Sequence, residues 1–167
     1  MVEESQVSDP AAAGTRKRMV HSFIIAPVAS LVLVAVLYFI LSPQIPGHIA
    51  MHVGPDGVGY GSTQLTIFIM WAVAAVVLAI GGATAREFMK HDHWYQKEKV
   101  IAVSIVAVGY GVIGVALATV LSTVGVSPDD VSGDSVGAGL LGFLGFFIAA
   151  IWVYIMVLPR GKMESVG

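Results

Sequence analysis

Two histidines and an aspartate in one short segment are candidates for binding a metal ion or a proton. His48, His52 and Asp56 recur every four residues. A spacing of four places side chains on one face of a helix, and an even spacing does the same on a strand. Imidazole nitrogens and carboxylate oxygens are ligands of Zn²⁺, and a free imidazole titrates at a pKa of about 6.5. The three residues are therefore candidate metal or proton ligands. The alternative is that both imidazoles bond to loop backbone or water.

A second group, His91, Asp92 and His93, has the His-x-His form that can bind metal. The alternative is a charged loop that stays solvated at the lipid headgroups. The chain has no Cys, which excludes disulfides and thiolate chemistry. It also lacks the His-Glu-x-x-His, Gly-x-Ser-x-Gly and phosphate-loop motifs. We therefore predict no catalytic residues, no resident metal, no cofactor and no enzymatic activity.

The elements that position these residues are membrane spans. Of the 167 residues, 56% are hydrophobic and 12% charged, and the mean hydropathy is +0.83. Soluble domains carry roughly 25% charged residues, so this chain has too little charge to cover a water-facing surface. A helix needs about 20 apolar residues to cross a bilayer. Four stretches without Asp, Glu, Lys or Arg reach that length, at about 19–42, 64–85, 100–122 and 137–158. We predict an all-α, four-helix transmembrane bundle within residues 16–162.

The basic residues predict how the bundle is oriented. All nine Lys and Arg residues lie before the first span, between the second and third, or after the fourth. Basic residues accumulate on the cytoplasmic side of membrane proteins. Both termini are therefore predicted to be cytoplasmic, with 43–63 and 123–136 as outer loops. The formal net charge of −2 gives no indication of nucleic-acid binding.

The segments outside the spans differ in character. The loop 43–63 is rich in Pro and Gly, and Pro55-Asp56-Gly57 is a turn signal. Ile49, Met51 and Val53 alternate with small or polar residues, which is typical of a short extended segment. We expect this loop to pack onto the outer ends of the helices. Residues 1–15 are predicted to be a disordered cytoplasmic tail, and 163–167 are too few to fold. Within the first span, Pro27 removes one backbone hydrogen bond and can kink the helix.

Small residues at helical spacing mark packing faces. The third and fourth spans each carry a stripe at i, i+4, i+7 and i+11: Ala107, Gly111, Gly114 and Ala118, then Ala138, Gly142, Gly145 and Ala149. The second span has a similar stripe at Ala72, Ala75, Ala79 and Gly82. Such stripes let helix backbones approach closely in lipid. We predict packing within a compact bundle of antiparallel neighbours. The alternative is that one stripe forms a homodimer face.

One run of residues in the first outer loop carries a family resemblance. It comprises Leu41, Ile45, Pro46, His48, Gly54, Pro55, Asp56, Gly57, Tyr60, Gly61 and Ser62. In this order they resemble a loop in the N-terminal domain of unknown function found in SdpI-like, toxin-immunity membrane proteins of bacteria. The chain departs from that loop at Ile49, Ala50, Thr63 and an insertion at 58–59. Spans three and four are also only about half as long as the membrane region that follows the domain in those proteins.

The resemblance implies a multi-pass protein of the bacterial plasma membrane, with immunity or signalling through the first outer loop. The tentative recognition residues are Pro46, His48, His52, Asp56, Gly57 and Tyr60. For Pro46, His48, Asp56 and Gly57, the alternative is that they define a turn of the fold. Expected partners are the lipid bilayer and a membrane protein or peptide, with homo-oligomerisation open. The alternative function is a small accessory subunit that packs against a larger membrane complex through its small-residue stripes.

Overall fold

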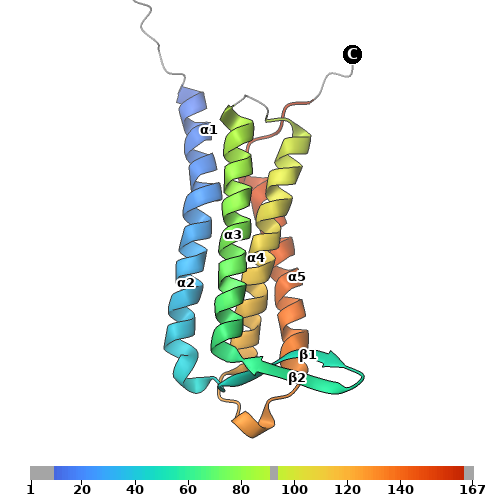
Figure 1. Ribbon diagram of the computed structural model, residues 1–167. Coiled ribbons are helices and arrows are strands. Elements are labelled where there is room, and N and C mark those ends of the chain that lie inside the picture. Colours follow the sequence, from blue (N-terminus) through green and yellow to red (C-terminus); the bar gives the residue numbers. More distant parts are fainter. Residues whose placement is uncertain (1–9, 91–93, 164–167) are drawn as a thin grey trace, which may run out of the picture.

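Membrane-length helices dominate the computed structural model, which describes residues 10–90 and 94–163 (Figure 1). Within these described residues, four helical stretches are long and apolar enough to cross a membrane. They are Lys17–Gln44, Thr63–Lys90, Gln96–Thr123 and Asp134–Val157. The predicted four-helix bundle is therefore confirmed. Each stretch contains nearly all of the corresponding apolar segment, because an uncharged run of this length gains most by forming a continuous helix in lipid.

The first stretch consists of several elements. Helix α1 (Pro10–Val20) leads into a π-helical turn, η1 (His21–Ile25), then helix α2 (Ala26–Leu41) and a 3-10 turn, η2 (Ser42–Gln44). The remaining elements are β1 (His48–Gly54), β2 (Gly57–Ser62), α3 (Thr63–Lys90), α4 (Gln96–Thr123), η3 (Pro128–Asp130) and α5 (Asp134–Val157).

Two boundaries differ from the prediction. Residues 10–15, expected in a disordered tail, belong to α1. The segment 86–99, expected as a loop, is largely helical, because α3 continues to Lys90 and α4 begins at Gln96. Arg, Glu, Met, Lys and Gln are good helix formers, so α3 and α4 both continue beyond the apolar stretches. His91, Asp92 and His93 lie outside the described residues.

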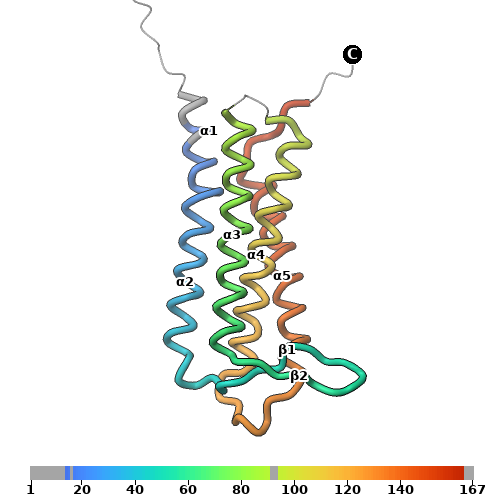
Figure 2. Tube along the Cα trace, viewed as in Figure 1, coloured from blue at the N-terminus to red at the C-terminus, as the bar shows by residue number. Residues whose placement is uncertain are grey.

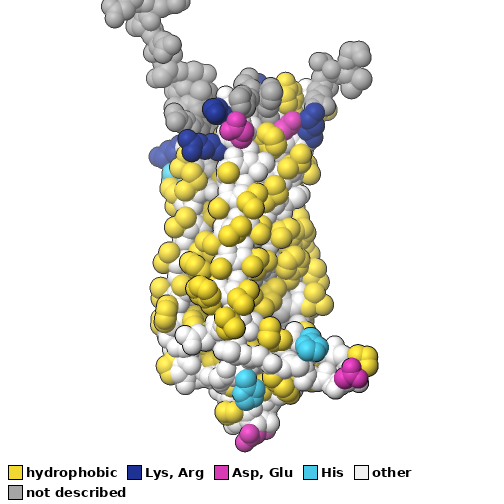
Figure 3. Space-filling model, viewed as in Figure 1, with side chains coloured by type: hydrophobic (Ala, Val, Ile, Leu, Met, Phe, Trp, Pro, Cys, Tyr) yellow, Lys and Arg dark blue, Asp and Glu magenta, His cyan; other side chains and the backbone are white. Residues whose placement is uncertain are grey.

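The two ends of the bundle differ in charge (Figure 3). We call one the basic end, since the described Lys and Arg residues gather there, near α1 and the segment that follows α5 (Figures 1 and 3). The opposite end, the hairpin end, carries β1, β2 and η3. Hydrophobic side chains cover the visible surface between the two ends (Figure 3). This order of charged end, apolar band and water-facing end matches a bilayer-spanning protein.

Helix α4 lies between α3 and α5, and α2 forms the edge of the bundle (Figure 2). Glycines allow the close approach of α4 to both neighbours. A Cβ on Gly109 would lie 2.7 Å from the Leu78 side chain of α3. A Cβ on Gly114 would lie 2.2 Å from the carbonyl oxygen of Gly142 on α5. No other residue fits at these contacts without displacing a neighbour, so the glycines set the spacing between helices.

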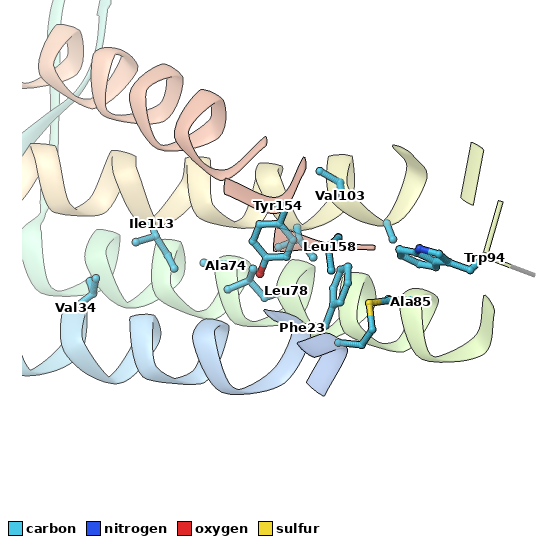
Figure 4. Packing of buried hydrophobic residues seen from close by; sticks show 13 residues of the cluster. Phe23, Val34, Ala74, Leu78, Ala85, Trp94, Val103, Ile113, Tyr154 and Leu158 are labelled. Carbon is cyan, nitrogen blue, oxygen red and sulfur yellow. The ribbon is translucent and has the colours of Figure 1, made fainter. Parts of the chain in front are cut away.

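The core is best filled in the half of the bundle near the basic end (Figure 4). Phe23 of η1 enters the space between the other helices and is only 4% exposed. Its ring meets Tyr154 of α5 edge-on at 5.4 Å and Trp94 at 6.4 Å. Aromatic pairs of this geometry stabilise a core beyond the area they bury. Phe23 therefore anchors the start of the first span to the bundle.

Pro27 acts through the π-helical turn that precedes it. The amide of Ala26 donates to the carbonyl of His21, five residues back. The carbonyl of Ser22 consequently receives neither the Ala26 amide nor an amide from residue 27, because proline has none. The Tyr154 hydroxyl donates to this carbonyl. A backbone acceptor freed by Pro27 is thus satisfied from α5, as lipid-buried backbone requires.

Candidate functional site

The base of the β1–β2 hairpin is fixed to the helix ends by hydrogen bonds to its backbone carbonyls. The Thr63 hydroxyl donates to the carbonyl of Pro46 at 2.6 Å, and the Thr63 amide donates to Gly47 at 3.1 Å. The amide of Gly125, which follows α4, donates to the carbonyl of Gln44 at 2.8 Å. These bonds join the end of the first span to the start of α3 and the end of α4. The hairpin therefore leaves the bundle from a rigid platform.

The hairpin then crosses the N-terminal end of α5 (Figure 1). Ile49 and Ala50 are 1% and 4% exposed. The Tyr60 hydroxyl donates to the carbonyl of Val131 at 3.1 Å, and Val53 lies so close to Gly133 that a Cβ there would come within 2.7 Å of it. The loop packs onto the ends of the helices, as predicted. The contacts with residues 131–133 also tie the hairpin to the segment between α4 and α5.

A β-bulge breaks the expected alternation of β1. The register pairs Ala50 with Tyr60 and His52 with Gly59, so Met51 is the extra residue. The Met51 side chain lies over Gly61, the His52 ring lies over Gly59, and the Thr66 hydroxyl donates to the Met51 sulfur at 3.7 Å. A predicted strand is confirmed here. Val53 lies on the opposite face from Ile49 and Met51, because the extra residue reverses the faces beyond it.

The bulge separates the two candidate histidines. Directly paired residues of an antiparallel sheet share a face, and alternate residues of one strand do the same. His48 pairs with Ser62 and thus shares the face of Tyr60, whereas His52 pairs with Gly59 on the other face. The even spacing therefore does not bring the two imidazoles together. Across residues 10–90 and 94–163, no three His, Cys, Asp or Glu side chains form a group that could hold a metal ion.

Pro55 and Asp56 form the two-residue turn between Gly54 and Gly57, as the turn signal predicts. Gly57 has a φ of 113°, which residues with a Cβ rarely adopt. Asp56 is exposed at the tip of the hairpin, and Pro46 is buried at its base. Pro46 and Gly57 therefore shape the hairpin, while His48, His52, Asp56 and Tyr60 present side chains to the surroundings.

One face of the hairpin combines three exposed side chains, and we call it the Tyr60 face: His48, Val53 and Tyr60. The His48 and Tyr60 rings meet edge-on with centroids 5.7 Å apart. Val53 is 59% exposed and Tyr60 is 52% exposed although each contacts the segment between α4 and α5. An imidazole, an aliphatic group and a phenol on a rigid support offer apolar area and hydrogen bonding, a combination that suits recognition of a peptide or protein.

The small-residue stripes are placed unequally. Gly111 of α4 contacts Phe143, and Gly114 contacts Gly142, so packing within the bundle is confirmed for this part. Ala107 is buried and Ala118 and Ala138 are half-buried. Gly145 and Ala149 are exposed, and nothing lies within 4 Å of a Cβ on Gly145. The prediction of internal packing is wrong for Gly145 and Ala149, because α5 instead buries Gly139, Ala150 and Tyr154.

Several structural residues were not identified in the sequence. Lys99 is buried at the basic end, where its ammonium donates to the carbonyls of Leu158 and Pro159 at 3.4 and 3.1 Å. It thereby satisfies carbonyls left free at the end of α5. Trp71 donates to the carbonyl of Leu31 at 3.1 Å across the seam between α2 and α3. A basic residue at the end of an apolar run indicates an anchor, but its target is set only by folding.

Comparisons of the chain with protein-family models, with curated proteins and with solved structures found no match. The SdpI-like resemblance of the first outer loop accordingly remains a prediction.

Proposed function

We propose that this chain is a non-enzymatic, multi-pass protein of the bacterial plasma membrane that recognises a peptide or protein through the Tyr60 face. The exposure of Val53 and Tyr60 on an anchored hairpin is the observation that supports it. Exposed apolar groups clustered on a water-facing element mark interaction surfaces. The resemblance of the same loop to SdpI-like proteins suggests toxin immunity or signalling as the purpose of that recognition.

A survival assay tests the immunity form of the proposal. Cells that express the chain are challenged with a panel of secreted, membrane-active bacterial peptides. We expect the chain to raise the tolerated concentration of at least one peptide several-fold. Val53→Asp and His48→Ala should lose this protection, because they place a charge on the Tyr60 face or remove its imidazole. His52→Ala is the matched control, since it removes an exposed imidazole from the opposite face. Protection by none of the peptides, or equal loss in both histidine variants, contradicts the proposal.

A second candidate is an accessory subunit of a larger membrane complex. It is favoured by the outward face of α5, where Gly145 and Ala149 lie beside exposed Leu141, Ile148 and Trp152. Small residues on a lipid-facing surface allow close packing of another helix. Purification of the tagged chain in mild detergent, followed by mass spectrometry, tests this function. A stoichiometric membrane protein that is lost with Gly145→Leu but retained with Ala29→Leu supports it. A solitary chain, or loss of the partner in both variants, contradicts it.

A further inference from the structure

A groove follows the seam between the first span and α3 in the half of the bundle near the basic end. Its volume is about 360 Å³. Ile24, Val28 and Leu31 line one wall, and Ala79, Ala83 and Arg86 of α3 line the other. The walls are almost entirely aliphatic, and Arg86 is the one charged residue among the described side chains that line the groove. The groove is thus apolar along its length and carries a positive charge.

The groove exists because small residues of α3 face a helix that is held away from them. Near the basic end, the backbone of Phe23 passes so close to Gly82 that a Cβ there would lie 2.9 Å from the Phe23 carbonyl oxygen. Toward the hairpin end, the hydrogen bond from Trp71 to Leu31 joins the same two helices. Between these contacts α3 presents small side chains, including the exposed Ala79. The seam is therefore fixed at two points and underfilled between them.

Its charge indicates the kind of occupant. Arg86 is exposed in the last part of α3, and no carboxylate of the described residues lies within ion-pair distance of it. Exposed Lys17 and Arg18 belong to α1, which lies at the same end of the bundle as the end of α3 (Figure 1). Basic residues beside a crevice between membrane helices suit an anionic lipid headgroup. An aliphatic groove that continues from such a site into the bilayer suits the acyl chain of the same molecule.

We propose that this groove binds an anionic phospholipid, with one acyl chain between α2 and α3 and its phosphate beside Arg86. A helix of a partner protein is about 10–12 Å wide with its side chains. The contacts at Gly82 and Leu31 hold the two walls too close for such a helix to enter the seam. A single hydrocarbon chain is much narrower than a helix and does not need the two walls to be so far apart. The occupant supports α2, which is otherwise the least buried span of the bundle.

Native mass spectrometry of the full chain, titrated with phosphatidylglycerol or phosphatidylcholine of identical acyl chains, tests the proposal. Each basic residue near an anionic lipid contributes roughly a fivefold gain in affinity. We therefore expect the wild-type chain to bind phosphatidylglycerol at least about fivefold more tightly than phosphatidylcholine. Arg86→Gln should lower that preference about fivefold, because it removes the basic residue that lines the groove. Lys90→Gln, one turn further along α3 and outside the groove, should preserve it.

A second pair of variants tests the groove itself. Ala79→Phe fills it and should remove the retained lipid, whereas Ala29→Phe, at an exposed site of α2 outside the groove, should not. Circular dichroism and thermal unfolding show whether each variant is folded. If Ala79→Phe does not fold, the lipid preference of Arg86→Gln still tests the proposal. Equal affinity of the wild-type chain for the two lipids overturns the proposal. So does equal loss in Lys90→Gln and Arg86→Gln, or a stoichiometric polypeptide that Ala79→Phe displaces.

Discussion

Single glycines decide how closely the helices of this protein pack. Gly114 and Gly145 have the same residue type and both belong to small-residue stripes, yet only Gly114 meets a neighbouring backbone. The spacing of the stripes predicts the contact face of α4 correctly, because α4 has helices on two sides and buries most of its small residues. It fails for half of the α5 stripe, since α5 contacts the bundle on one side only and periodicity does not say which face that is.

Gly114→Ala should lower the free energy of unfolding by about 1–3 kcal/mol, the usual cost of overpacking. The added methyl group would collide with the carbonyl group of Gly142. The measurement is reversible unfolding in mixed detergent micelles. Gly145→Ala serves as the control, because open space surrounds it and the substitution should leave stability unchanged or slightly raised. Equal destabilisation by both substitutions would contradict the observed packing of α4 against α5.

Tyr154 is the second residue whose role depends on its surroundings. Its hydroxyl satisfies the Ser22 carbonyl that the π turn and Pro27 leave without an amide. Tyr154→Phe keeps the ring contacts with Phe23 but removes this donor. We expect a loss of about 1 kcal/mol in unfolding free energy, within the range for hydrogen bonds between membrane helices.

The double variant Tyr154→Phe/Pro27→Ala distinguishes this explanation from a general loss of packing. Alanine supplies the missing amide, so the cost of losing the hydroxyl should be smaller in the Pro27→Ala background than in the wild-type chain. Additive costs in the two backgrounds would show that the hydroxyl acts elsewhere.

Among the elements, hydrogen bonds between residues 94–99 and the segment after α5 close the basic end. The Lys162 amide donates to Trp94 at 2.8 Å, the Gln96 amide donates to Lys162 at 3.2 Å, and Lys99 reaches Leu158 and Pro159. Lys99→Met should therefore loosen residues 158–163 while preserving most of the aliphatic packing. Hydrogen exchange of the Lys162 amide should accelerate at least several-fold. Lys90→Met is the control, because it removes a basic residue of α3 instead. We expect the exchange of the Lys162 amide to be unchanged in this variant.

The hairpin shows where element prediction succeeds and where it stops. Pro55-Asp56-Gly57 predicts the turn, because these residue types favour tight reversal. The alternation of residues 49–53 predicts a strand, yet it misses the bulge at Met51. The bulge arises from cross-strand and tertiary contacts, namely Met51 over Gly61 and against Thr66. The alternation of residues along one strand carries no information on such contacts. It therefore could not predict that His48 and His52 lie on opposite faces of the hairpin.

At the scale of the whole molecule, the distribution of charge predicts orientation. The chain has no Cys, so single cysteines can report topology without background labelling. Asp56→Cys at the hairpin tip should react with a membrane-impermeant maleimide in intact cells. Arg160→Cys should react only after the membrane is permeabilised, because the positive-inside rule assigns the basic end to the cytoplasm. The reverse pattern of labelling would invert the proposed orientation and place the Tyr60 face inside the cell.

Residue order alone predicts four helices long and apolar enough to cross a membrane, since uncharged runs of about 20 residues have few other stable arrangements in lipid. It also predicts a turn at Pro55–Gly57 and the gathering of the basic residues at one end of the bundle. Folding in three dimensions sets which small residues pack, where the Ser22 carbonyl finds its donor, and which histidine shares a face with Tyr60. It also left the groove beside Arg86 open. These features depend on contacts between residues distant in the chain, whereas composition and periodicity describe each segment separately.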